Sequence, residues 1–139
     1  MTKRVAEVMT KDPVAVHLDV VLTEAAKIMR DHSIGDVLVI SDGHLCGVLT
    51  DRDIVVRAVA ENRDPRRTTV GDVCSADIAA LEPDADATDA ARLMRARAIR
   101  RIPVVSDGEP VGVVSMGDLA IERDKKSVLS DISKAPANR

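Results

Sequence analysis

The chain has 139 residues, a mass of 14.9 kDa and a formal net charge of −3, with 20 Lys and Arg against 23 Asp and Glu. This length fits one compact domain or two small halves that share a core, and the balanced charge gives no general attraction to nucleic acids or anionic membranes. Phe, Tyr and Trp are absent, which excludes aromatic stacking platforms and aromatic cages and leaves an aliphatic core.

The sequence contains no run of about 18 apolar residues, and its first residues lack the apolar stretch of a signal peptide. We therefore expect no membrane span and a cytoplasmic protein. Cys46 and Cys74 lie far apart and have no metal-ligand residues beside them. This pattern favours two buried free thiols over a disulfide.

The first elements in chain order are a short lead helix, a brief strand, an amphipathic helix, a hairpin and a closing helix. Apolar positions of the long helix recur at i, i+3, i+4 and i+7, and Asp42-Gly43 between β-branched runs is a strong hairpin signal. The predicted ranges are helix Val5–Met9, strand Val14–Val16, helix Leu22–His32, strands Val37–Ser41 and Leu45–Thr50, and helix Arg52–Ala60.

The same pattern returns after a polar linker, Asn62–Thr68. Val5–Val59 aligns without a gap with Val70–Asp124, and about 18 of 55 positions are identical. The second set of predicted ranges is helix Val70–Cys74, strand Ala79–Leu81, helix Ala87–Arg97 with Asp86 as N-cap, strands Ile102–Ser106 and Val111–Ser115 around Asp107-Gly108, and helix Gly117–Arg123.

The repeat predicts an α/β fold with two pseudo-symmetric β-α-β-β-α repeats. Each repeat is too short to bury much apolar surface alone, so the two are expected to pack on each other. We assign residues 1–64 to the first repeat with its lead and linker, 65–126 to the second repeat, and 127–139 to a C-terminal tail.

Each repeat ends a hairpin strand with a hydroxyl residue and places an aspartate three residues later: Thr50 and Asp53, then Ser115 and Asp118. Free N–H groups and the dipole at a helix start favour an anion such as phosphate. The hydroxyl can donate to that phosphate, and a carboxylate can accept from both hydroxyls of a ribose. The same spacing also forms a capping box, which needs no ligand, so both interpretations stay open.

Only the second repeat carries the segment Ile99-Arg100-Arg101-Ile102-Pro103. The two arginines either reach a phosphate or are solvated and paired with aspartates. Pro103 lacks an N–H and suits a strand start or edge, where neighbouring backbone groups stay free for an adenine edge. The first repeat has Gly35-Asp36 and Leu38 at these places, so the repeats do not offer equivalent sites.

In this order, and duplicated, these motifs resemble a tandem pair of CBS domains, the family named after cystathionine β-synthase. The resemblance rests on Gly47–Ile54, Gly112–Leu119, Ile99–Val104 and Glu24-Ala25-Ala26, and it covers about 120 residues. It implies a pseudo-two-fold module that binds AMP, ADP, ATP or S-adenosylmethionine in a cleft between the repeats. By that resemblance, Asp53 and Asp118 hold the ribose, Thr50 and Ser115 contact phosphate, and Ile99, Arg100, Arg101, Ile102 and Pro103 frame the base.

We expect no catalysis, because His17, His32 and His44 stand beside no nucleophile and show no metal-site spacing, and because glycine-rich phosphate loops are missing. The expected protein is a regulatory sensor that needs no cofactor. It works as a homodimer, through aliphatic helix faces such as Ile54–Val59, and through an unidentified protein partner; charge balance and missing aromatics disfavour nucleic acid. The alternative is a ligand-free structural or stress-response dimer in which the four hydroxyl and aspartate residues only cap helices.

Overall fold

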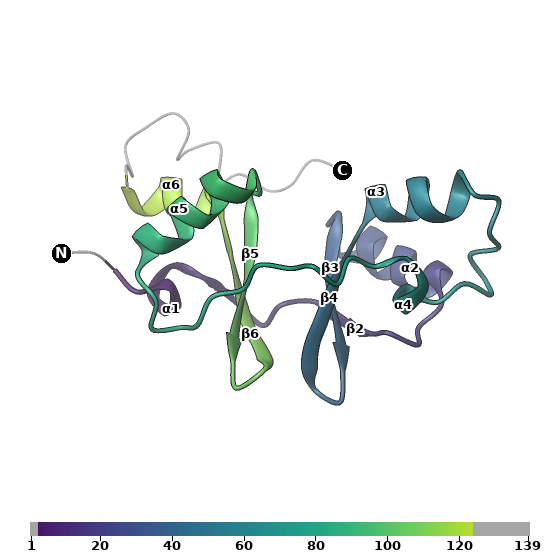
Figure 1. Cartoon of the computed structure of the whole chain (residues 1–139), viewed down its shortest axis with the longest axis horizontal. Helices are drawn as coiled ribbons and strands as arrows, with labels where there is room; N and C mark the ends of the chain where they lie inside the picture. Colours follow the sequence, from purple (N-terminus) through teal and green to yellow (C-terminus); the bar gives the residue numbers. More distant parts are fainter. Residues whose placement is uncertain (1–2, 124–139) are drawn as a thin grey trace. The chain divides into compact units, whose positions relative to one another are not determined.

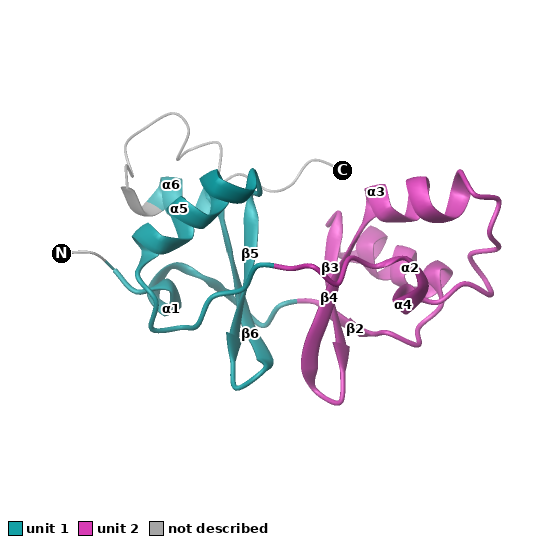
Figure 2. Cartoon of the chain, viewed as in Figure 1, with its two compact units in different colours: residues 1–13, 79–136 teal, residues 14–78, 137–139 magenta. Residues whose placement is uncertain are grey.

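A computed structural model describes residues 3–123 of the chain. These residues form two compact units (Figure 2): unit 2 is the continuous segment 14–78, and unit 1 combines residues 3–13 with 79–123. Each unit holds one three-stranded sheet with its own helices. The tail assigned to residues 127–139 lies outside the described residues.

Unit 2 is built on the sheet β2-β3-β4 (Figure 1). Strand β3 (Asp36–Ser41) pairs in parallel with β2 (Ala15–His17) and antiparallel with β4 (His44–Thr50). Helix α2 (Leu22–His32) links β2 to β3, and β4 is followed by α3 (Asp51–Ile54), the π-helical turn η1 (Val55–Val59) and α4 (Val70–Val73). The buried core of this unit contains Val16, Leu22, Ala25, Met29, Val37, Val39, Leu49, Ala58, Val70 and Val73.

Unit 1 has an antiparallel sheet in the order β1-β6-β5. Its strands are β1 (Thr10–Lys11), β5 (Arg101–Ser106) and β6 (Glu109–Ser115), and its helices are α1 (Val5–Val8), α5 (Ala87–Arg97) and α6 (Met116–Arg123). The core contains Val5, Ala90, Met94, Ile102, Val104 and Val114. Both sheets therefore bury aliphatic residues against helices, as the aromatic-free composition requires, and the α/β fold prediction is confirmed.

The lead segments are exchanged between the repeats. The first repeat begins with α1, yet the Val5 N–H donates to the Ala85 carbonyl at 2.7 Å and Thr10 pairs with Val113, both in unit 1. The second repeat begins with α4, yet the Val70 N–H donates to the Val20 carbonyl at 2.7 Å in unit 2. The compact units therefore have boundaries near residues 13 and 78, which differ from the repeat boundaries of the sequence.

The two long helices and both hairpins are confirmed. Helices α2 and α5 have the predicted bounds. At each hairpin turn the Asp-Gly pair has two positive φ angles, 52° and 78° at Asp42-Gly43 and 50° and 82° at Asp107-Gly108, as a type I′ turn requires. Helix α2 ends at Ser33 and α5 at Ala98, with φ of 55° and 54°.

The predicted strand Ala79–Leu81 is wrong: only Leu81 forms a bridge, to Val104. In the first repeat, the N–H of Leu18 continues the pairing by donating to Ile40 at 3.1 Å. The equivalent residue in the second repeat is Pro83, which has no N–H to donate. The second repeat therefore loses its first strand.

The closing helix of the first repeat also differs from the prediction. It begins at Asp51 and becomes a π-helical turn at Val55–Val59, where the Ala60 N–H donates to the Val55 carbonyl at 2.9 Å. The valines of this turn are poor α-helix formers, because their branched side chains crowd the preceding turn. At the start of α5, Asp86 occupies the N-cap position but its side chain makes no capping bond.

None of the helices within residues 3–123 combines the length and apolar character needed to cross a bilayer.

Candidate functional site

The two strand–helix junctions contain the same hydrogen-bonded cap. In unit 2, the Thr50 N–H donates to Asp53 Oδ2 and the Asp53 N–H donates to Thr50 Oγ1, each at 3.0 Å. In unit 1, the Ser115 N–H donates to Asp118 Oδ2 at 2.9 Å and the Asp118 N–H to Ser115 Oγ at 3.0 Å. The structure thus forms a reciprocal capping box at both predicted sites.

These caps leave polar groups for a ligand. A carboxylate offers about four lone-pair positions, and a hydroxyl donates one proton while it accepts. The cap uses one oxygen of each aspartate and only the acceptor capacity of each hydroxyl. A hydroxyl–carboxylate pair at each junction is therefore chemically able to meet a phosphate and a diol without losing the cap.

In unit 2 the aspartate lies beside a cation that the sequence interpretation missed. Arg57 Nε is 3.9 Å from Asp53 Oδ1, and the Asp53 side chain is only 13% exposed. The same guanidinium donates from Nη1 to the Val73 carbonyl at 3.1 Å and to the Cys74 carbonyl at 3.4 Å. The four-residue spacing from Asp53 to Arg57 was the available signal, because residues i and i+4 are neighbours on a helix.

In unit 1 the arginine segment lies beside the serine junction. The Met116 N–H donates to the Arg100 carbonyl at 2.8 Å, and Arg101 is the strand partner of Ser115. The fold therefore brings Arg100, Arg101, Ser115 and Asp118 to one end of the β5-β6 hairpin. At the equivalent place in unit 2, Thr50 is paired with the acidic Asp36.

The remaining part of the predicted base-framing segment is largely inside the core. Ile102 has no exposed surface, Pro103 is buried, and Ile99 packs partly against the same core cluster. Strand β5 is the edge of its sheet, which suits Pro103. The prediction that backbone groups beside Pro103 stay free is wrong along the edge of β5 that does not face β6. There the Pro103 carbonyl accepts from the Leu81 N–H at 3.0 Å, and the Val105 N–H donates to the Leu81 carbonyl at 2.8 Å.

The electrostatics of unit 2 show how such a cap acts on an aspartate. Thr69 and Asp72 form another capping box, at the start of α4. The hydrogen bond from the backbone N–H of Thr69 is the main cause that lowers the pKa of Asp72.

Cys46 and Cys74 are both free thiols, as expected, although both are half-buried. Burial raises the pKa of the Cys74 thiol, and nearby Cys46 and Asp53 add to that effect.

Within residues 3–123, no group of three or more His, Cys, Asp and Glu side chains is arranged to hold a metal ion.

Comparison with known proteins agrees with the duplicated architecture. The family model of the CBS domain matches residues 5–59 and 70–124. The chain is 38% identical to the CBS domain-containing protein YhcV of Bacillus subtilis, over 86% of this chain and 84% of that protein. It is 37% identical to hypoxic response protein 1 of Mycobacterium tuberculosis, over 71% of this chain and 70% of that protein.

Two solved structures extend this agreement to the fold. Hypoxic Response Protein I, solved with two coordinated zinc ions, has a TM-score of 0.79 at 32% identity and covers 86% of this chain and 98% of its own. The CBS domain pair of protein MJ0100, solved with 5′-methylthioadenosine and S-adenosyl-L-methionine, has a TM-score of 0.78 at 26% identity, covering 91% and 100%. With two family matches along its length and the fold of a CBS pair, this chain belongs to the CBS domain family.

Proposed function

We propose that this CBS pair is a non-catalytic regulatory sensor that binds an adenosine nucleotide of the AMP, ADP or ATP class. The observation that carries this proposal is the junction in unit 1, where the segment Arg100-Arg101 lies beside a hydroxyl and a carboxylate. Charged, hydroxyl and carboxylate groups at one place match the phosphate and ribose of a nucleotide. The complex of a similar CBS pair with 5′-methylthioadenosine and S-adenosyl-L-methionine supports the adenosine part of this ligand.

In this proposal Asp118 accepts from the ribose hydroxyls, and Ser115 donates to phosphate with help from Arg100 and Arg101. The base lies against the Ile99–Pro103 segment, which Ile102 and Pro103 fix from the core side. Thr50 and Asp53 form the corresponding pair in unit 2. There Asp36 stands where unit 1 has an arginine, so we expect the unit 2 site to bind an anionic ligand more weakly.

The sensor needs an output, because ligand binding regulates only when two states of the protein differ in affinity. We propose that the protein works in the cytoplasm as a homodimer and passes its signal to a protein partner. No resident cofactor is part of this proposal.

The test is calorimetric titration of nucleotide-free protein with AMP, ADP, ATP and S-adenosylmethionine. We expect micromolar binding of at least one of them, and one ligand per chain would favour the Asp118 site over the Asp53 site. Asp118→Ala should abolish binding and lower the free energy of unfolding by only about 1 kcal/mol. Asp72→Ala is the matched control, because it breaks the same kind of cap in α4, outside the proposed site, and should leave affinity unchanged.

Unchanged affinity in Asp118→Ala would remove the ribose role from that residue. No binding across the panel would favour the second candidate, a ligand-free structural dimer. One observation favours that candidate: both junctions complete their capping bonds within the chain alone. In that case all four hydroxyl and aspartate residues would affect stability only.

A further inference from the structure

One arginine of unit 2 connects the Thr50–Asp53 junction to the end of α4. Arg57 Nε lies 3.9 Å from Asp53 Oδ1. Arg57 Nη1 donates to the Val73 carbonyl at 3.1 Å and to the Cys74 carbonyl at 3.4 Å. Val73 is the last residue of α4 and Cys74 is its C-cap, where carbonyl groups have no partner inside the helix. Arg57 therefore gives hydrogen bonds to a helix end and a positive charge to the junction.

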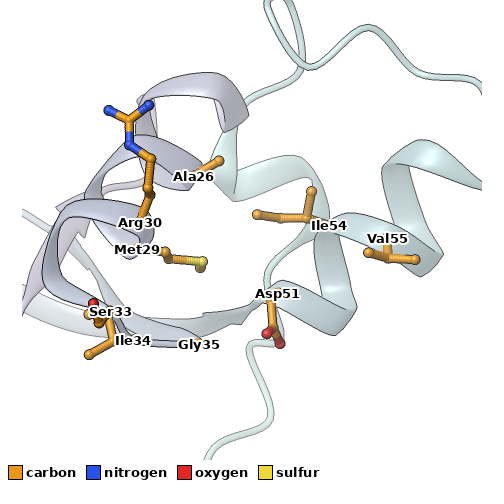
Figure 3. Close-up of a pocket in the computed structure, with 9 residues that line it drawn as sticks. All are labelled: Ala26, Met29, Arg30, Ser33, Ile34, Gly35, Asp51, Ile54 and Val55. Atoms are coloured by element: carbon orange, nitrogen blue, oxygen red, sulfur yellow. The ribbon is translucent and has the colours of Figure 1, made fainter. Parts of the chain in front are cut away.

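Helix α3, which carries Asp53, is anchored on its other side by the core. Ile54 points toward Met29 of α2 (Figure 3) and packs against the core cluster of unit 2. Asp51, the other acidic residue of α3, lines the hollow between the two helices with Ile54. Core packing therefore fixes the helix, and the cap bond to the Thr50 N–H orients the Asp53 carboxylate.

These contacts leave the Asp53 carboxylate little capacity for a ligand. Its Oδ2 accepts from the Thr50 N–H, its Oδ1 lies beside the guanidinium of Arg57, and only 13% of the side chain is exposed. To hold a ribose, the carboxylate must accept from two hydroxyls. Because so little of Asp53 is exposed, a ribose could reach Oδ1 only if the contact with Arg57 opened.

The second repeat carries the opposite charge at the corresponding position of the sequence. The repeat alignment places Glu122 opposite Arg57, and each stands four residues after the aspartate of its cap. A glutamate cannot neutralise Asp118. The Ser115–Asp118 cap therefore makes the same two hydrogen bonds as the cap in unit 2 without a positive charge at this position.

We infer that Arg57 makes an autoinhibitory contact: it neutralises Asp53 and keeps that carboxylate from a ribose, so that nucleotide binds at the unit 1 junction alone. The inference rests on the proposed function and names the residue that makes the two sites unequal. Arg57 is a positioning residue, because it acts through Asp53 and not on the ligand. Removing the contact should open a second site in unit 2.

The opposite role, a direct contact of Arg57 with phosphate, predicts a different result. The contacts of Nε with Asp53 and of Nη1 with the two carbonyls disfavour that role. Adenosine has a ribose and no phosphate, so its affinity reports on the carboxylate alone. Loss of a phosphate contact would weaken AMP binding and leave adenosine binding unchanged, whereas loss of an autoinhibitory contact strengthens adenosine binding.

The test is calorimetric titration of the full chain with adenosine and with AMP, in an Asp118→Ala background that disables the unit 1 site. Arg57→Gln in this background should raise the adenosine affinity by about fivefold or more. Adding Asp53→Ala should abolish the gain, because the released carboxylate is then missing. Circular dichroism verifies that each variant is folded.

Two arginine variants are the controls. Arg57→Lys keeps a positive charge beside Asp53 and should retain most of the inhibition. Arg63→Gln is the matched control, because Arg63 Nη2 lies 3.5 Å from Asp72 Oδ2, the aspartate of another capping box in unit 2. This variant removes the same kind of ion pair and should leave the adenosine affinity unchanged.

Salt gives a readout that a merely structural role would not produce. Adenosine is uncharged, and salt weakens the ion pair between Asp53 and Arg57. In the Asp118→Ala background the adenosine affinity should therefore rise with salt concentration, and Arg57→Gln should remove this dependence.

Unchanged adenosine affinity in Arg57→Gln, or a gain that survives Asp53→Ala, would overturn the autoinhibitory contact. Nucleotide binding by the native chain would still support the sensor proposal in that case. If neither the native chain nor the Arg57→Gln variant binds adenosine, AMP, ADP or ATP, both proposals fail.

Discussion

The junctions of the two repeats share one cap and differ in the charge around it. Thr50–Asp53 and Ser115–Asp118 make the same pair of hydrogen bonds, with lengths that agree within 0.1 Å. Around the first junction the chain places Asp36 and Arg57; around the second it places Arg100 and Arg101. The duplicated backbone geometry is thus retained, while the side chains that would select a ligand have diverged.

Among the substitutions that test this comparison, we expect the largest loss of stability at two equivalent glycines, Gly47 and Gly112. A Cβ on Gly47 would lie 2.8 Å from the Ser75 carbonyl oxygen, and a Cβ on Gly112 would lie 2.8 Å from that of Thr10. Each alanine substitution should therefore lower the free energy of unfolding by about 1–3 kcal/mol, as measured by denaturant titration.

Gly35→Ala is the control for these two variants. The nearest atom to its added Cβ is a carboxylate oxygen of Asp51 at 3.1 Å, and a side chain can move where a backbone carbonyl cannot. An equal loss of stability in Gly35→Ala would contradict the backbone explanation.

The next largest effect compares the caps directly. Thr50→Ala and Ser115→Ala each remove one capping bond, so each should cost about 1 kcal/mol of unfolding free energy. Only the Ser115 variant should also weaken nucleotide binding markedly, because its junction has the two arginines. Thermal melts and calorimetry of both variants measure the two quantities. A much larger nucleotide effect at Thr50 would reverse the proposed order of the sites.

A smaller effect is expected where the long helices end. Ala98 terminates α5 with a φ of 54°, a left-handed conformation that strains a residue with a Cβ. Ala98→Gly should stabilise the protein by about 0.5 kcal/mol, because the relief of strain exceeds the entropy that glycine loses. A fall in melting temperature in this variant would mean that the Ala98 methyl group stabilises the fold by more than the left-handed backbone conformation destabilises it.

The smallest effect is a pH dependence at Asp72. The bond from the Thr69 N–H holds the pKa of Asp72 below its ordinary value of 3.8 in the folded chain. Ionised Asp72 therefore stabilises the fold fully above pH 3.8, and this contribution is lost as the pH falls through the lowered folded pKa. The stability difference between the native chain and Asp72→Asn, measured by urea unfolding, should be constant near neutral pH and shrink in acid. A difference that grows in acid would contradict this assignment.

Local signals in the sequence were enough to predict the parts of the fold that local interactions determine. The helical periodicity of Leu22–His32 and the Asp-Gly turns depend on neighbouring residues only, and both are confirmed. The two-residue strand β1 was not predicted, because Thr10–Lys11 carries no periodic signal and its partner, β6, lies about a hundred residues away. The exchange of the lead segments between the repeats could not be predicted from the sequence for the same reason.

The candidate site shows the same limit. The hydroxyl–aspartate pairs were predicted because three-residue spacing at a helix start defines a cap. The contact of Arg57 with the Val73 carbonyl, and the bridge from Leu81 to the backbone around Pro103, depend on segments that meet only in the folded chain. The sequence therefore predicted the polar pairs and the arginine segment, but it did not predict the contacts of Arg57 or the bridge of Leu81.

The exchanged lead segments also affect how the chain is made. Unit 2 is continuous in sequence, so residues 14–78 are synthesised in one stretch and can fold while synthesis continues. Unit 1 is split: Val5 and Thr10 precede unit 2 in the chain, and their partners Ala85 and Val113 follow it. Unit 1 can therefore be completed only after unit 2 has been synthesised.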